Sequence, residues 1–168
     1  MNPWYITLMG WVVCISVGYF LFSVILPLFV IPNLAFIKTK IQKTKRLREF
    51  SKKFKSKNKE KTLKNVYNFV IKNYKGKEQR YKVALLLPKV YFQDVEKIIK
   101  KNQFLHCHIF DRVFITLLIN TGQFYEEDFE IKLQISSFGT IHQYLIVKLN
   151  GKRIKVDPFC RVFEKHRK

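Results

Sequence analysis

A histidine and an aspartate stand on either side of a tight turn in the second half of the chain. Asn150-Gly151 is the strongest short signal for a two-residue hairpin, so residues 141–149 and 152–157 are expected to pair as antiparallel strands. In that register His142 is the diagonal neighbour of Asp157 on one face, within reach of its carboxylate. A carboxylate that accepts the Nδ1 proton of a histidine orients the ring and stabilises the imidazolium, as in a catalytic triad.

Cys107 is the candidate nucleophile for such a pair. It stands at the predicted start of an amphipathic helix, where free N–H groups and the helix dipole lower the pKa of a thiol and favour the thiolate. Taken alone, a cysteine at the head of such a helix is more often a small core residue, and a lone histidine on a strand is usually structural. Cys107, His142 and Asp157 therefore indicate catalysis only when they are considered together.

The order and spacing of these residues resemble the transglutaminase-like cysteine enzyme superfamily, whose fold is related to papain. In that family a cysteine opens a helix that ends in glycine fifteen positions later, as Cys107 and Gly122 do here. A strand that begins with histidine follows, then a turn and a strand that closes in Asp-Pro, as in His142-Gln143-Tyr144 and Val156-Asp157-Pro158. The resemblance covers residues 62–159.

The resemblance implies a catalytic triad of Cys107, His142 and Asp157 that works through an acyl-enzyme and needs no cofactor. For the oxyanion of the tetrahedral intermediate we expect the backbone N–H of Cys107 as donor, with Gln103 as a side-chain donor. Tyr144 stands where the family usually has tryptophan, and it is expected to keep an aromatic wall at the substrate site.

His106 and His108 flank Cys107 and raise the question of a metal site. Residues two positions apart at the start of a helix are expected to point to different sides. The chain also has no separated pair of cysteines or histidines with zinc-ligand spacing. The sequence therefore predicts no metal.

Helices followed by a strand meander are expected to position these residues, which indicates an α+β domain of helices packed on an antiparallel sheet. The apolar periodicities predict helices over residues 63–74, 93–101 and 107–121 and strands over residues 129–135, 141–149 and 152–157. The hairpin face opposite His142 and Asp157 is the more apolar one. Either both faces are covered, or His142 reaches the helix from the end of its strand.

The N-terminal segment, residues 1–37, contains no Asp, Glu, Lys or Arg. A bilayer core about 30 Å thick needs roughly 20 apolar residues in a helix. The run from Trp4 to Leu26 supplies them before Pro27 and Pro32 discourage helix continuation. The segment is not expected to be a signal peptide, because it has neither a positively charged n-region nor a small-residue cleavage site. The segment is therefore predicted to be a transmembrane anchor that crosses the membrane once.

Residues 38–61 are predicted to form a basic linker between this anchor and a domain over residues 62–168. Twelve Lys or Arg stand here against Glu49 and Glu60, a net charge of +10 out of +20 for the whole chain. Basic residues beside a span stay on the cytoplasmic side, so the domain is predicted to be cytoplasmic. Anionic lipid headgroups are the expected partner of the linker. Nucleic acid is less favoured, because no nucleic-acid-binding motif accompanies the charge.

These patterns predict a membrane-anchored cysteine acyl-transfer enzyme, most simply a peptidase or amidase acting on a peptide or protein. Three cysteines without disulfide-like spacing suit a reducing compartment. Two alternatives stay open: an inactive module of the same fold that binds a peptide or an anionic membrane surface, and a nucleic-acid-binding membrane protein. Replacing Cys107 with serine would abolish the function of the enzyme but not that of the inactive module, and a strongly salt-dependent affinity for RNA or DNA would favour the third.

Overall fold

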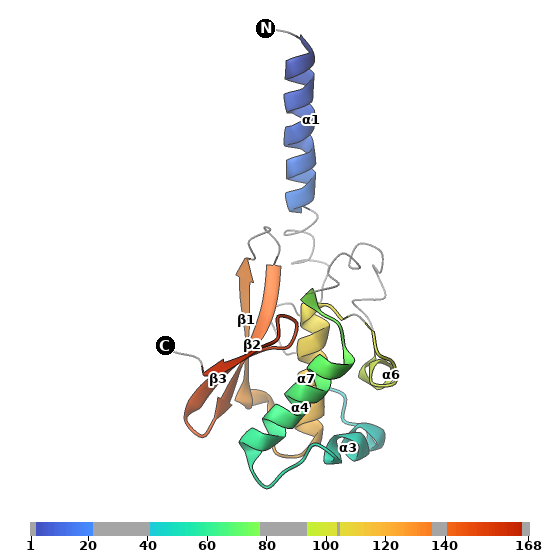
Figure 1. The fold of residues 1–168 in the computed structure, drawn as a ribbon, viewed down its shortest axis with the longest axis vertical. Coiled ribbons are helices and arrows are strands. Elements are labelled where there is room, and N and C mark those ends of the chain that lie inside the picture. The colour runs from blue at the N-terminus through green and yellow to red at the C-terminus, as the bar shows by residue number, and fades with distance from the viewer. Residues whose placement is uncertain (1–2, 22–40, 78–93, 104, 136–140, 166–168) are drawn as a thin grey trace.

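The computed structural model of the chain describes residues 3–21, 41–77, 94–103, 105–135 and 141–165 (Figure 1). Helices precede strands, as predicted for an α+β domain. In chain order the elements are α1 (Pro3–Phe20), α3 (Lys45–Lys52), α4 (Lys59–Asn73), α6 (Val95–Ile98), α7 (Cys107–Asn120), the 3-10 helix η3 (Glu126–Asp128), β1 (Phe129–Ile135), β2 (Ile141–Leu149), β3 (Lys152–Asp157) and β4 (Val162–Lys165).

The four strands form one antiparallel sheet in the order β1-β2-β3-β4. The predicted hairpin and its register are confirmed, since Leu149 pairs with Lys152 and Leu145 pairs with Val156. Asn150 and Gly151 have φ angles of +49° and +73°. Positive φ at both turn residues is what a tight hairpin requires, and asparagine and glycine tolerate it best. The register that was expected to bring His142 to Asp157 is therefore the one the chain adopts.

Helix α7 is the central element of the core. Every one of its side chains except His108 and Arg112 is buried, and the helix packs against α3, α4, α6 and β2 (Figure 1). It ends where Gly122, with a φ angle of +74°, adopts the left-handed conformation that terminates a helix. Both faces of β2 are covered: Leu145 belongs to the main core, and Ile146, which points the opposite way, is also fully buried.

The basic segment supplies side chains to this core. Leu47 of α3 is fully buried and Phe54 nearly so. The ring of Phe50 packs against those of Phe54 and Phe69, and the Lys53 ammonium lies 3.5 Å from the centre of the Phe50 ring. A cation above an aromatic face is attracted by the ring. Part of the charge of residues 38–61 thus sits on a helix packed on the domain, while the division at residues 37 and 61 stays a prediction.

Helix α1 corrects the prediction of a transmembrane anchor. Its 18 residues give a length of about 27 Å at 1.5 Å per residue, short of a hydrocarbon core of about 30 Å. Among the residues described, no helix is long and apolar enough to cross a bilayer. The predicted single-pass span is therefore wrong, and so is the membrane localisation built on it. The prediction rested on an uncharged run of sequence, and the part of that run beyond residue 21 lies outside the described residues.

Three of the described elements were not predicted: α3, η3 and β4. Helix α3 was missed because its few apolar residues are interspersed among basic ones. Thr44 caps this helix, since its hydroxyl accepts a hydrogen bond from the backbone N–H of Leu47 at 3.2 Å. Strand β4 is only four residues long; its first two residues are half-buried and its last two are exposed. The short helix expected over 93–101 forms only over the four residues of α6.

Candidate active site

His142 and Asp157 form a buried pair on neighbouring strands. The Nε2 atom of His142 lies 2.6 Å from Oδ2 of Asp157, with 6% and 3% of the two residues exposed. The other carboxylate oxygen accepts a hydrogen bond from the backbone N–H of Cys160 at 3.0 Å. The meeting predicted from the hairpin thus occurs, but through Nε2 instead of Nδ1. Because Asp157 engages Nε2, the nitrogen left to exchange a proton with a nucleophile is Nδ1.

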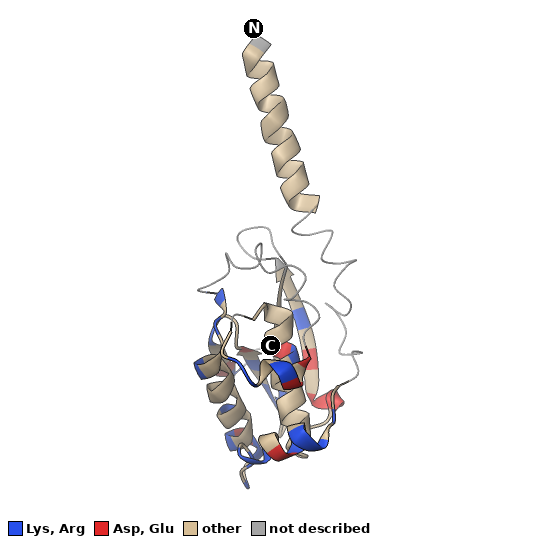
Figure 2. Cartoon of the chain, turned by 90° about the vertical axis from the view of Figure 1, so that its right-hand side faces the viewer, with Lys and Arg blue, Asp and Glu red and all other residues tan. Residues whose placement is uncertain are grey.

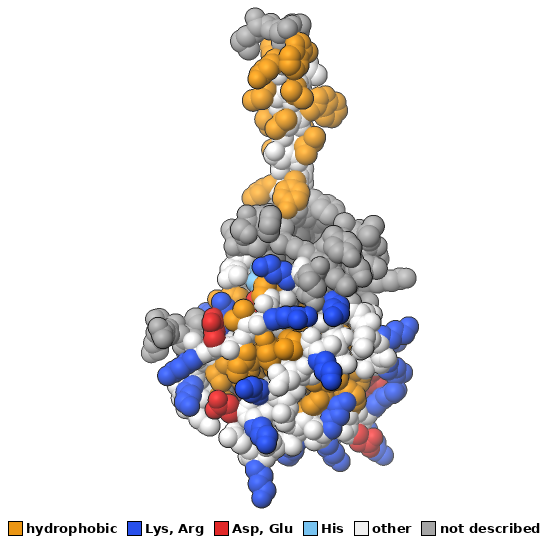
Figure 3. Space-filling view, viewed as in Figure 1, with side chains coloured by type: hydrophobic (Ala, Val, Ile, Leu, Met, Phe, Trp, Pro, Cys, Tyr) orange, Lys and Arg blue, Asp and Glu red, His pale blue; other side chains and the backbone are white. Residues whose placement is uncertain are grey.

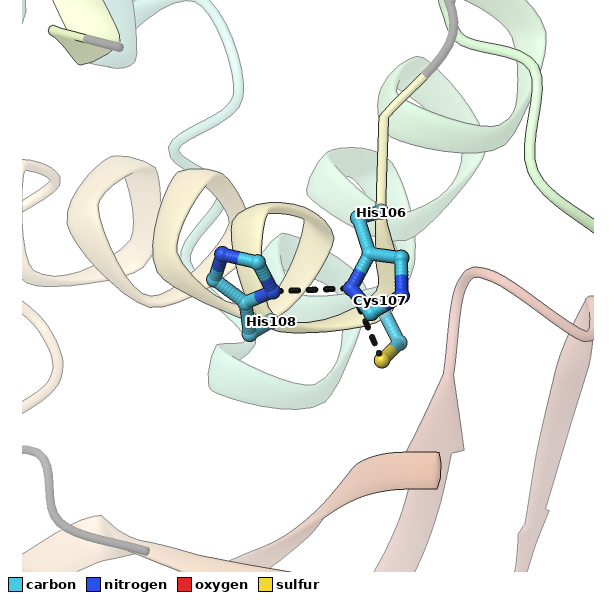
Figure 4. Close-up of side chains that lie close together, drawn as sticks. All are labelled: His106, Cys107 and His108. Atoms are coloured by element: carbon cyan, nitrogen blue, oxygen red, sulfur yellow. Dashed lines mark hydrogen bonds between the residues drawn. The ribbon is translucent and has the colours of Figure 1, made fainter. Parts of the chain in front are cut away.

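Cys107 is the first residue of α7 and is 2% exposed. Its Sγ lies 3.4 Å from Nδ1 of His106, the residue in extended conformation that caps the helix (Figure 4). Burial raises the pKa of the Cys107 thiol, but the charge of His106 and hydrogen bonds with His106, His108 and His142 outweigh it and hold that pKa well below its ordinary value. The site therefore favours a thiolate.

His142 completes the electrostatics of the site. Burial lowers its pKa, whereas hydrogen bonds with Asp157, Cys107 and Cys160 and the charge of Cys107 raise it to about 12. Helix α7 packs on β2, and the pKa shifts of Cys107 and His142 couple the thiol of the helix to the imidazole of the strand. A thiolate beside an imidazolium that a carboxylate holds in place is the resting state of an activated cysteine nucleophile.

His106 and His108 converge instead of pointing apart. Their Nδ1 atoms lie 2.8 Å from each other, and the two rings, inclined at 56°, point these nitrogens toward one another beside Cys107 (Figure 4). The expectation that they diverge is wrong because His106 precedes the helix in an extended conformation, with a ψ angle of 159°, and so does not follow the helical progression of side-chain directions. Three imidazoles therefore surround the thiol, not one.

Phe159 links the two sides of the site, and the sequence analysis did not single it out. Its buried ring lies 6.1 Å from the ring of His106 and 5.6 Å from that of His142. Its carbonyl accepts a hydrogen bond from the backbone N–H of Lys77 at 3.1 Å. Gly76 allows this approach, since a methyl group there would lie 2.6 Å from the Phe159 oxygen. The neighbouring residue, Lys75, exchanges two backbone hydrogen bonds with the segment that leads into α7, at Gln103 and Leu105.

Asp111 and Gln143 form a second buried connection between α7 and β2. The Gln143 side-chain amide donates a 2.9 Å hydrogen bond to Asp111, and each residue is 2% exposed. Burial raises the pKa of the Asp111 carboxyl well above its ordinary value; the bond from Gln143 and the charge of His142 oppose this, while the nearby negative charges reinforce it. A signal was present, since an aspartate one turn after Cys107 on an apolar helix face needs a buried partner.

The two residues predicted to line the substrate site, Gln103 and Tyr144, are both half-buried. The backbone carbonyl of Gln103 accepts the hydrogen bond from Lys75 N–H at 3.1 Å. The Lys155 ammonium lies 4.8 Å from the centre of the Tyr144 ring. Their roles as oxyanion donor and aromatic wall stay predictions.

Among the residues that the structure describes, two groups of three side chains could hold a metal ion, with ligand atoms in each group within 4.8 Å of one another. One is His106, Cys107 and His108. The other is His142, Asp157 and Cys160, whose Sγ lies 3.7 Å from Nε2 of His142. Donor atoms thus gather on both sides of the thiol.

Comparisons with known proteins give one distant likeness in fold. No family model matches the chain, and no curated protein does. Among solved structures, Legionella pneumophila LapG is similar with a TM-score of 0.48 and 16% identity; the match covers 71% of this chain and 63% of LapG. A likeness at this level carries no argument about the fold or the activity of this chain.

Proposed function

We propose that this chain is a transglutaminase-like cysteine acyl-transfer enzyme that hydrolyses a peptide or amide bond. The observation that carries the proposal is the buried His142–Asp157 pair, with Nε2 and Oδ2 2.6 Å apart, on the sheet that packs against the helix that Cys107 begins. The imidazole of this pair also helps to hold the pKa of the Cys107 thiol well below its ordinary value. Nucleophile, base and orienting carboxylate are the three roles that the chemistry requires.

In the proposed reaction His142 holds the proton of the Cys107 thiol. The thiolate attacks the carbonyl carbon of the substrate, and the oxyanion that forms takes hydrogen bonds from the N-terminal N–H groups of α7, among them that of Cys107. The carbon–nitrogen bond then breaks, and the leaving amine takes the proton from His142. Water attacks the resulting thioester, transfers a proton to His142 and releases the acid, which restores the thiol.

Asp157 acts on His142 throughout this cycle. It holds the ring through Nε2 and stabilises the imidazolium that forms twice in each turnover. Because Asp157 is itself held by the Cys160 backbone N–H, the carboxylate cannot rotate away without losing a hydrogen bond. The sheet thus supplies the base in a fixed orientation.

The pH dependence of Cys107 alkylation by iodoacetamide tests the proposal in the full chain. Peptide mass spectrometry would follow Cys107 and the exposed Cys14 in the same sample, so that Cys14 serves as an internal reference. We expect Cys107 to titrate well below the ordinary thiol value of about 8.5, and to move toward it in His142→Ala and Asp157→Asn.

If the alkylation rate of Cys107 in the folded chain depends on pH as that of Cys14 does, the proposal of an enzyme is contradicted and an inactive binding module is favoured. Denaturation in guanidinium provides the control for burial, because both thiols should then react alike. A profile that is low in the folded chain and ordinary in the unfolded chain would support activation by the fold.

We propose separately that the basic segment binds an anionic surface of lipid headgroups. A pocket of about 380 Å³ beside the end of α7 is lined by Lys43, Arg48, Lys52 and Lys55, with no acidic side chain among the described residues around it. Lys and Arg also outnumber Asp and Glu along the chain (Figure 2), and basic side chains outnumber acidic ones on the face of the domain drawn in Figure 3. Like charges gathered in one pocket repel, and an anionic surface relieves that repulsion. Sedimentation with anionic but not neutral vesicles, weakened by salt, is the expected result; equal binding to both would contradict it.

A further inference from the structure

We propose that His106, Cys107 and His108 form a Zn²⁺ site that shares the thiol of the nucleophile. The binding site stands on its own geometry. Its consequence, reversible inhibition by zinc, rests on the proposed function.

The three donor atoms are already close to the arrangement that zinc requires. Tetrahedral Zn²⁺, with Zn–N of about 2.05 Å and Zn–S of about 2.3 Å, places two nitrogens about 3.3 Å apart and a sulfur about 3.6 Å from a nitrogen. Here the two Nδ1 atoms are 2.8 Å apart, and the Cys107 Sγ is 3.4 Å from Nδ1 of His106 (Figure 4). All three donor atoms lie within 4.8 Å of one another, and a shift of about half an ångström between the two ring nitrogens would bring them to the separation that zinc sets.

The donor set selects the kind of metal. One thiolate and two imidazoles suit Zn²⁺ and other late transition metals, whereas Ca²⁺ and Mg²⁺ prefer oxygen ligands. No carboxylate belongs to this group of three. Three protein ligands leave a fourth tetrahedral position for water.

The positions of the ligands lower the cost of ordering them. His106 and Cys107 stand where the chain enters α7, a junction held by the backbone hydrogen bonds of Lys75 with Gln103 and Leu105. The His106 ring also packs near Phe159. Ligands that the fold already positions lose little conformational freedom on binding.

Binding balances as follows. Two Zn–N bonds and one Zn–S bond form, and the thiol proton, held in the free site by Cys107 or by His142, is released to solvent. The imidazole that holds a proton between the two Nδ1 atoms carries it on Nε2 instead. The sulfur lone pair that would attack a carbonyl is then engaged by the metal, so zinc and substrate exclude each other.

Co²⁺ titration of the full chain, reduced with a phosphine, tests the site with a readout independent of activity. Thiolate-to-cobalt charge-transfer absorption and intense d–d bands would report a tetrahedral site that contains sulfur, and added Zn²⁺ should remove both. We expect His106→Ala and His108→Ala each to weaken binding by more than about tenfold, the loss that even outer-shell changes produce. Cys107→Ser should abolish the charge-transfer band.

His142→Ala is the matched control, because it removes an imidazole beside the same thiol but not a proposed ligand; binding should survive it. Absence of the charge-transfer band in the parent chain would overturn the site. The site would also be overturned if binding survives His106→Ala and His108→Ala but is lost in Asp157→Asn or Cys160→Ser. The metal would then lie in the group formed by His142, Asp157 and Cys160.

Alkylation of Cys107 with and without Zn²⁺ separates the two proposals. Protection of the thiol by zinc, reversed by a chelator, is expected whether or not the thiol is activated. If zinc binds but Cys107 titrates like Cys14, the metal site is supported and the proposed enzyme is contradicted. If Cys107 is activated but zinc neither binds nor protects it, the proposed enzyme is supported and the metal site is contradicted.

Discussion

The candidate site has a helix side, residues 106–108, and a strand side, the pair of His142 and Asp157, and the two are assembled in different ways. On the helix side, three consecutive residues, 106–108, place two imidazoles and a thiol together at one chain junction. On the strand side, His142 and Asp157 are fifteen positions apart and meet only because the hairpin register joins them. A local cluster needs little of the fold to exist, whereas the strand-side pair is a product of the sheet. The strand side should therefore couple strongly to stability and the helix side weakly.

The largest expected effect is that of Asp157→Asn. It leaves the imidazolium of His142 buried without its carboxylate, and removal of one partner of a buried ion pair costs about 3–5 kcal/mol. Urea unfolding measures the loss. The helix-side control, His106→Ala, should cost about 1 kcal/mol, a typical value for a single substitution. Equal losses in the two variants would remove the distinction between the two sides.

Gly76→Ala should come next, because it disturbs the segment that holds both sides together. A methyl group at this position would lie 2.6 Å from the Phe159 carbonyl oxygen and 3.2 Å from the Phe110 ring. Forcing extra volume into a packed site costs about 1–3 kcal/mol. Gly10→Ala is the control, since a methyl group there meets nothing within 4 Å. Thermal unfolding compares the two, and a Gly76→Ala variant as stable as the parent would show that this close contact is not needed.

Gln143→Leu tests the second connection between α7 and β2. It removes the 2.9 Å hydrogen bond to Asp111, and a buried polar group left without a partner costs about 1–3 kcal/mol. In the double variant Asp111→Leu/Gln143→Leu much of this loss should be recovered, because no polar group is then stranded. Strictly additive losses in this double-mutant cycle would show that the two side chains do not act as a pair.

The smallest effect is a plateau in the pH dependence of stability. The pKa of His142 is raised in the folded chain, so its contribution is complete below its unfolded pKa of about 6.5 and is lost as pH rises toward about 12. The pKa of Cys107 is lowered, so its contribution is complete above about 8.5 and is lost as pH falls through its folded pKa. Between about pH 6.5 and 8.5 the two changes cancel.

Unfolding free energies of the parent and of Cys107→Ser/His142→Gln, measured across this range, give the contribution of the pair as a difference. The difference should rise up to about pH 6.5, stay flat to about pH 8.5 and then fall by about 1.4 kcal/mol per pH unit. A steady slope through the flat interval would mean that only one of the two groups has a shifted pKa.

Local patterns predicted most of the secondary structure around the site. The period of two in residues 129–135 and the turn at Asn150-Gly151 predicted β1, β2 and β3 with their bounds, and the spacing of apolar residues predicted α4 and the start of α7 at Cys107. These signals lie within a few residues of the features they predict, because backbone hydrogen bonding repeats over short distances. The contact of His142 with Asp157 followed from the same register.

Contacts between elements depended on how α7 docks on the sheet. The hydrogen bond from Gln143 to Asp111 spans 32 positions, and the approach of Phe159 to Gly76 joins segments still farther apart. Such distances carry no periodic signal. The same limit applies to the N-terminal segment, where the absence of charge predicted a span that the length of α1 does not support.

The sequence by itself therefore determined the first three strands, the register of the β2–β3 hairpin and the residues of the strand-side pair, since these follow from side-chain alternation and one turn. Only the tertiary structure decided that this pair couples to the thiol of α7. It also showed that His106 and His108 converge on that thiol and that Asp157 engages Nε2. The physical reason is that register is set by neighbouring hydrogen bonds, whereas the placement of a helix against a sheet is set by the packing of the whole core.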